Sequence, residues 1–173
     1  MQWVHFPLHP DTPQEGLALE QLFAGRGYDL DAMFAQMKAR MAEEGLEYGQ
    51  RSHTYNSRLA QELGKWAETQ PGGDAIHDAL NRAYFVDGKN IADKDILLDI
   101  AASVGLPREE AENVLENRLF RQAVDEDWSK SHAYGVTGVP TFVAGGYGVV
   151  GAQQYEALEQ LLDQVGATRK AGE

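Results

Sequence analysis

The stretch Gly135–Gln153, which runs GVTGVPTFVAGGYGVVGAQ, carries the clearest structural signal in the sequence. Residues 136–144 are rich in β-branched and aromatic side chains and predict a strand that contains one proline, and residues 147–150 predict a returning strand. The Gly145-Gly146 pair between them is typical of a two-residue hairpin turn. Residues 153–165 then follow helical spacing, which predicts a closing amphipathic helix.

Upstream of this stretch the hydrophobic periodicity is of two kinds. Residues 2–8 alternate with a period near two, which predicts a short strand that runs into a loop held extended by Pro7, Pro10 and Pro13. From Leu17 to about Tyr134 the spacing is helical. The expected order is therefore a strand, a long helical block, a β-hairpin and a final helix.

Short polar residues and glycines mark the ends of helices within the block. Asp93 is placed to accept hydrogen bonds from the free amides at a helix start, and Gly105 is placed to close that helix. Asn56 is placed in the same way to cap a helix over residues 57–69. These local signals predict where individual helices begin and end.

One helix of the block has a stripe made of methionines. Met33, Met37 and Met41 recur every four residues, so they share one helical face. Methionine usually fills irregular gaps inside hydrophobic cores. We therefore expect this stripe to be buried.

Composition limits the classes of function. The chain has 173 residues with 43% hydrophobic content, enough for one domain or for a small α/β core with an insertion. Its formal net charge of -12 disfavours a nucleic-acid partner, because phosphate would be repelled. No stretch approaches the roughly 20 apolar residues of a membrane helix, and the start lacks the features of a secretory signal. We expect no membrane partner and a cytoplasmic location.

The sequence contains no cysteine, which excludes thiolate nucleophiles, disulfides and cysteine-ligated metals in this chain. The histidines show no helical pairing or metalloprotease spacing, so we expect no metal site. No serine lies in a hydrolase elbow, and no glycine-rich loop opens a helix as in nucleotide-binding proteins. We therefore predict no catalytic residue within this chain.

The sequence resembles the DsbA-like superfamily of thioredoxin-fold proteins, and within it the FrnE-like branch, whose relatives include hydroxychromene-carboxylate isomerases and kappa glutathione transferases. The resemblance rests on Gly135–Phe142 followed by Gly148–Gln153, and it extends to Ala83-Tyr84-Phe85, Asn90–Asp93, Leu97–Gly105 and the opening Trp3, Phe6 and Pro10. It implies an α/β, thioredoxin-like fold with a large inserted all-α domain. The implied division is a thioredoxin-like part over 1–14 and 135–167 and an inserted helical domain over 15–134.

The chain departs from this family at its start. Members begin with a strand that leads into Cys-x-x-Cys at a helix N-terminus, where the helix dipole lowers the pKa of the attacking thiol. Residue 1 here corresponds to a point after that helix, so the implied thioredoxin-like fold is N-terminally incomplete. We expect a truncated start, and the alternative is a homodimer in which a partner chain supplies or swaps strands.

Four residues are predicted to bind substrate on the strength of the resemblance: Thr137, Val139, Pro140 and Asn56. Pro140 resembles the cis-proline that shapes the family's substrate groove, and the backbone of Val139 would pair with an extended substrate strand. The alternative for Pro140 is a proline that starts an edge strand. Asn56 resembles a polar position near the active site of glutathione-dependent relatives, and its alternative role is the helix cap.

Two functional classes follow from the resemblance. The first is a thiol–disulfide oxidoreductase acting on protein thiols and disulfides, or a glutathione-dependent isomerase, and both are inactive without the absent motif. The second is a non-catalytic module that binds an extended peptide or a protein in the cis-proline groove. No cofactor is expected, except glutathione if the isomerase interpretation holds.

Overall fold

The computed structural model describes residues 2–168. Its contacts divide the chain into two compact units. The helical unit is His9–Glu126, and the described part of the hairpin unit consists of residues 2–8 and 127–168. The division falls within one continuous helix, α7 (Arg121–Ala133). The domain boundaries implied by the family resemblance stay a prediction.

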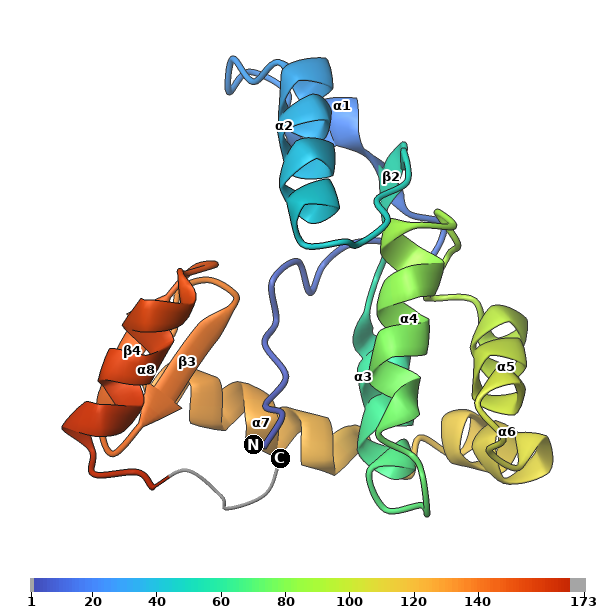
Figure 1. Ribbon diagram of the computed structural model, residues 1–173. Coiled ribbons are helices and arrows are strands. Elements are labelled where there is room, and N and C mark those ends of the chain that lie inside the picture. Colours follow the sequence, from blue (N-terminus) through green and yellow to red (C-terminus); the bar gives the residue numbers. More distant parts are fainter. Residues whose placement is uncertain (1, 169–173) are drawn as a thin grey trace. The chain divides into compact units, whose positions relative to one another are not determined.

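The helical unit contains two very short strands and a group of packed helices (Figure 1). Its elements are β1 (Leu17–Ala18), α1 (Leu19–Leu22), α2 (Leu30–Glu43), β2 (His53–Thr54), α3 (Arg58–Ala67), α4 (Ala75–Phe85), α5 (Lys94–Ser103) and α6 (Arg108–Glu116). The two strands pair antiparallel. Helix α3 packs against α4 and α6, and α5 packs against α4 and α6.

The hydrophobic core of this unit lies among α3, α4, α5 and α6. Leu63, Ile76 and Leu97 are completely buried in it, and Trp66 is almost so. Burial of a side chain of this size contributes about 1.5–3 kcal/mol. These helices are therefore held mainly by their shared apolar faces.

The predicted helix signals are confirmed where they are local. Asp93 Oδ1 accepts from the backbone N–H groups of Asp95 and Ile96, so Asp93 caps α5. Gly105, with φ of +81°, follows the end of α5 in the left-handed conformation that glycine adopts readily.

The prediction of a buried methionine stripe is wrong. Met33 and Met37 are 40% and 43% exposed, and α2 has no buried side chain. Periodic apolar residues identify a face of a helix, but they do not supply an element that covers it. The face remains a surface of α2 in the described chain.

The hairpin unit has β3 (Thr141–Ala144) paired antiparallel with β4 (Tyr147–Val150), and α8 (Tyr155–Gln164) packs against both strands (Figure 1). The predicted hairpin and closing helix are thus confirmed. Gly145 and Gly146 have φ of +53° and +86°, which suits the type I′ turn of a two-residue hairpin. Residues 136–140 form a loop and not the start of the strand.

The prediction of a strand over residues 2–8 is wrong for the described structure. A strand requires a neighbour that completes its hydrogen-bond ladder, and no described strand lies alongside this segment. The segment instead bonds to α7: the N–H of His5 donates to Asp127 Oδ2 over 3.1 Å. Lys130 Nζ donates to Gln2 Oε1 over 3.3 Å. Alternating hydrophobicity therefore marked an extended segment and not a paired one.

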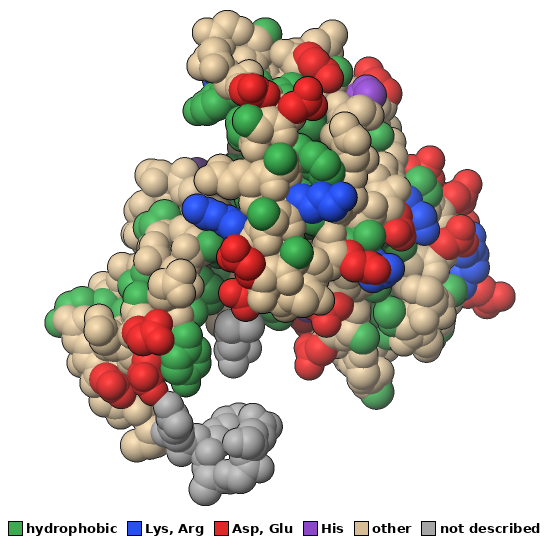
Figure 2. Space-filling view, turned by 45° about the horizontal axis from the view of Figure 1, so that its top comes forward, with side chains coloured by type: hydrophobic (Ala, Val, Ile, Leu, Met, Phe, Trp, Pro, Cys, Tyr) green, Lys and Arg blue, Asp and Glu red, His purple; other side chains and the backbone are tan. Residues whose placement is uncertain are grey.

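On the face drawn in Figure 2, acidic and basic side chains lie among one another. On the face in Figure 2, acidic side chains outnumber basic ones, and apolar side chains lie between them. This matches the formal net charge of -12. No helix among residues 2–168 has the length and apolar character needed to cross a bilayer.

Candidate functional site

The predicted substrate-binding residues Thr137, Val139 and Pro140 lie together on the loop that joins α7 to β3. The loop leaves α7 by a glycine turn: Gly135 has φ of +69°, and its N–H donates to the carbonyl of His132. The N–H of Val136 donates to the carbonyl of Ser131 over 3.0 Å. This pair of bonds is the Schellman arrangement that ends helices at a left-handed residue.

Two hydrogen bonds hold the loop where it enters β3. The carbonyl of Pro140 accepts from the N–H of Gly151 over 2.7 Å, which extends the β3–β4 ladder by one pair. The hydroxyl of Thr141 donates to the carbonyl of Gly138 over 2.6 Å. The peptide bond between Val139 and Pro140 is cis. Sequence reasoning placed Pro140 in the site but did not identify Thr141, whose hydroxyl closes the turn.

The ladder register determines which backbone groups of β3 are used. Ala144 pairs with Tyr147 across a two-residue turn, a position at which both N–H and C=O bond to the opposite strand. Because the pattern alternates, Phe142 and Pro140 also direct their polar groups toward β4. The N–H and C=O groups of Val139, Thr141 and Val143 therefore point to the opposite edge of β3.

This outer edge of β3 is open within the described chain. The sheet has only β3 and β4 in residues 2–168. Val139 and Val143 are 49% and 42% exposed. The N–H and C=O of Val139 have no hydrogen-bond partner among the described residues. Such an edge can add an extended strand by main-chain pairing.

Asn56, the fourth predicted site residue, lies in the helical unit at the start of α3. Its Oδ1 accepts from the N–H of Arg58 over 2.9 Å, and its Nδ2 donates to the carbonyls of Thr12 and Pro10 over 2.7 and 3.2 Å. Both amide hydrogens are thus occupied. Asn56 lies one residue before Ser57, the N-cap of α3, so it accepts from the first N–H of the helix and ties the loop before β1 to it.

An ion cluster beside Asn56 escaped sequence reasoning. The side chain of Glu62 is fully buried, and it accepts from Arg58 Nε over 2.8 Å and from Arg118 Nε and Nη2 over 2.8 and 2.6 Å. Burial alone would raise the pKa of Glu62, but hydrogen bonds from Arg118 and Arg58 outweigh it and hold that pKa below its usual value. The sequence offered only the four-residue spacing of Arg58 and Glu62 as a signal.

Arg118 reaches this carboxylate from an unusual backbone conformation. Its φ of +51° lies in the left-handed region, which is uncommon for a residue with a side chain. The backbone there turns between α6 and α7 and delivers the guanidinium to Glu62. The cluster stabilises the helical unit and presents no nucleophile.

Within residues 2–168, no group of three or more His, Asp or Glu side chains is arranged to hold a metal ion.

A hairpin entered through a proline and closed by a packed helix is the carboxy-terminal half of a thioredoxin fold. The family model for the DSBA-like thioredoxin domain matches residues 1–163 of this chain. The chain therefore belongs to the DSBA-like thioredoxin domain family, and its fold is thioredoxin-like.

Three relatives give this assignment more detail. A solved structure of a probable DsbA oxidoreductase from Streptomyces coelicolor is 29% identical, with a TM-score of 0.84 over 96% of this chain and 75% of that one. The uncharacterized protein YwbO of Bacillus subtilis is 30% identical over 64% of this chain and 55% of its own length. The cytosolic disulfide reductase DsbM from Pseudomonas aeruginosa with GSH shares the fold alone, at 23% identity and a TM-score of 0.54 over 84% of this chain and 74% of that one.

The extent of these matches bears on function. The chain spans about half the length of the curated relative that it matches, and three quarters of the Streptomyces structure. The sequence also has no cysteine.

Proposed function

We propose that this chain binds an extended polypeptide along the outer edge of β3 and serves a DsbA-family thiol–disulfide oxidoreductase as its substrate-binding part. The observation that carries the proposal is the open edge itself. The N–H and C=O of Val139 have no partner among the described residues, and those of Thr141 and Val143 point the same way. Main-chain pairing would supply affinity with little dependence on sequence.

The loop before β3 supports this role by being fixed in place. The bonds from Gly151 to Pro140 and from Thr141 to Gly138 hold both ends of the turn that carries Val139. A fixed edge loses little conformational freedom when a strand is added. Thr137 is exposed on the same loop, where its side chain can contact the bound segment.

Thiol–disulfide exchange requires a thiolate that attacks a disulfide sulfur. This sequence contains none, so the attacking thiols in our proposal belong to a polypeptide segment outside it. The proposal implies that the binding partners of this chain are extended polypeptide segments that carry protein thiols or disulfides. A substrate-binding role for Asn56, a cytoplasmic location and a homodimer stay predictions.

The proposal is tested by titrating the isotope-labelled chain with a blocked, cysteine-free Val/Thr peptide of roughly eight residues, the length of an ordinary strand. We expect saturable shifts of the Val139, Thr141 and Val143 amides and slower hydrogen exchange at these positions. Binding that leaves those amides unchanged while shifting others would contradict the proposal.

A matched pair of variants locates the edge. Val143→Pro removes an N–H that points to the outer edge of β3 and that the ladder to β4 does not use. Val150→Pro makes the same change on the opposite edge of the hairpin. Loss of one net hydrogen bond of about 1 kcal/mol predicts roughly fivefold weaker peptide binding for Val143→Pro alone. Equal effects of the two variants would refute the assignment.

A further inference from the structure

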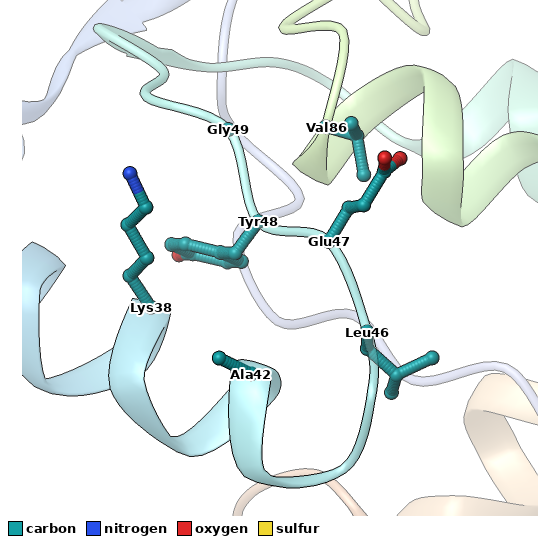
Figure 3. A pocket seen from close by; sticks show the side chains of 7 residues that line it. All are labelled: Lys38, Ala42, Leu46, Glu47, Tyr48, Gly49 and Val86. Carbon is teal, nitrogen blue, oxygen red and sulfur yellow. The ribbon is translucent and has the colours of Figure 1, made fainter.

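A separate hollow in the helical unit lies between α2, the segment that follows it and the end of α4 (Figure 3). We call it the α2 pocket, and its volume is about 280 Å³. It is lined by Lys38, Ala42, Leu46, Glu47, Tyr48, Gly49 and Val86. The volume is close to the lower end of small-molecule sites, about 300 Å³.

One wall of the α2 pocket contacts the end of α4 through its backbone at Gly49. The N–H of Gly49 donates to the carbonyl of Phe85 over 2.9 Å, at the last residue of α4. A Cβ at Gly49 would lie 1.9 Å from the carbonyl oxygen of Val86, so only glycine permits this approach. The segment is therefore tied to the end of α4 at Gly49.

Aromatic packing fixes the adjoining side chain. The ring of Tyr48 lies between two others, with centroids 5.8 Å from Phe34 and 6.4 Å from Phe85. Figure 3 shows this ring extending from the segment toward Lys38 and Ala42 of α2. The pocket thus has one aromatic wall and aliphatic walls from Ala42, Leu46 and Val86.

The charged groups at the pocket differ in how they are used. Glu47 is paired with Arg82, whose Nη2 lies 2.6 Å from its Oε2. Lys38 forms no ion pair with any described residue, and its ammonium lies 5.8 Å from the centroid of the Phe34 ring. One unneutralised cation therefore stands beside apolar walls in a chain whose formal net charge is -12.

We propose that the α2 pocket binds a small apolar carboxylate, with a hydrocarbon body of one ring or a short acyl chain. The hydrocarbon body would contact Ala42, Tyr48 and Val86, and the carboxylate would pair with Lys38. An amine would meet the Lys38 charge and be repelled, while inorganic phosphate would leave the apolar walls uncovered. The proposed peptide edge on β3 involves none of these residues.

Two carboxylic acids and the corresponding uncharged carboxamides test the proposal. Binding is measured by calorimetry and by NMR shifts of the protein's backbone N–H groups. The acids are phenylacetate and hexanoate, and the amides are phenylacetamide and hexanamide. We expect at least one acid to bind with a dissociation constant of about 1 mM or below and to shift the amides of residues 38–49. The acid that binds more tightly identifies a ring or an acyl chain as the natural body. Failure of both to saturate at about 20 mM would overturn the proposal.

Charge and shape are separated by variants. Lys38→Met should weaken acid binding about threefold to fivefold, the range of a partly exposed ion pair, and leave amide binding unchanged. Arg40→Met removes the same charge from the same helix outside the lining and should have no effect. An equal loss of acid affinity in both variants would mean that the acid is attracted by the positive charges of the helix in general and that Lys38 forms no specific site. Ala42→Leu places a larger side chain in the lining and should abolish binding of both acids and carboxamides. The circular dichroism spectrum of this variant should equal that of the parent. Retained binding would refute the pocket as the binding site.

Discussion

Replacing Glu62 by glutamine tests whether the buried ion cluster holds the helical unit together. The substitution keeps the shape of the side chain and removes its charge. The carboxylate is fully buried and accepts three hydrogen bonds from two arginines, so its loss removes the ion-pair partner of Arg118, while Arg58 keeps Asp125, whose Oδ1 lies 2.7 Å from its Nη2. Breaking a buried pair costs about 3–5 kcal/mol. Because Arg118 is 41% exposed and can be hydrated, we expect about 3 kcal/mol.

The pH dependence gives an independent signature of the same cluster. The pKa of Glu62 is lower in the folded chain than in the unfolded chain, so its charge stabilises the fold above its ordinary pKa of about 4.3. That contribution is lost as the pH falls through the folded pKa. The free energy of unfolding should therefore decline more steeply in the parent than in Glu62→Gln below about pH 5.

Urea unfolding and thermal unfolding, each followed by circular dichroism from neutral to acid pH, measure the free energy of unfolding and the melting temperature. At roughly 2–4 °C per kcal/mol for a chain of this size, the melting temperature of the variant should fall by about 6–12 °C at neutral pH. Glu15→Gln is the control, because Glu15 is exposed and has no ion pair among the described residues. A Glu62→Gln variant as stable as the control, or parallel pH profiles, would refute the reasoning.

Two further pairs of substitutions, each a test and its control, probe the packing of the chain by the same unfolding measurements. Gly49→Ala should lower the free energy of unfolding by about 1–3 kcal/mol, because its Cβ would meet the Val86 carbonyl. Gly138→Ala has open space around it and should change that free energy by no more than about 0.5 kcal/mol. Equal losses in the two variants would contradict the contact. Leu63→Ala should lower the free energy of unfolding by about 2–5 kcal/mol, because Leu63 is completely buried. Met37→Ala, at a 43% exposed position, should change it little. A large loss of stability at Met37 would mean that this face of α2 is covered in solution.

Sequence reasoning succeeded where the determinants of structure are local. A cap such as Asp93 and a turn such as Gly145-Gly146 act within a few residues, so their chemistry is visible in the sequence. It failed where a second element decides the outcome. Alternation over residues 2–8 cannot supply a neighbouring strand, and the spacing of Met33 and Met37 cannot supply a covering surface.

The same distinction applies to the candidate sites. Val139 and Pro140 were placed by resemblance to a family, and the structure adds the direction of the backbone groups on β3. The second partner of Glu62 could not be found in the same way, since Arg118 lies 56 residues away and only the tertiary fold brings it close. The α2 pocket likewise joins Lys38 to Val86 across two helices, with no spacing rule to connect them.

The left-handed backbone of Arg118 has an evolutionary consequence. A glycine would adopt φ of +51° without steric cost, but it would abandon the carboxylate of Glu62. Position 118 is thus under two opposing requirements: low backbone strain, which favours glycine, and the ion pair with Glu62, which favours arginine. Lineages that replace the acid at position 62 by an apolar residue are freed from the second requirement, and glycine should then spread at position 118. The two positions are expected to covary, although 56 residues separate them.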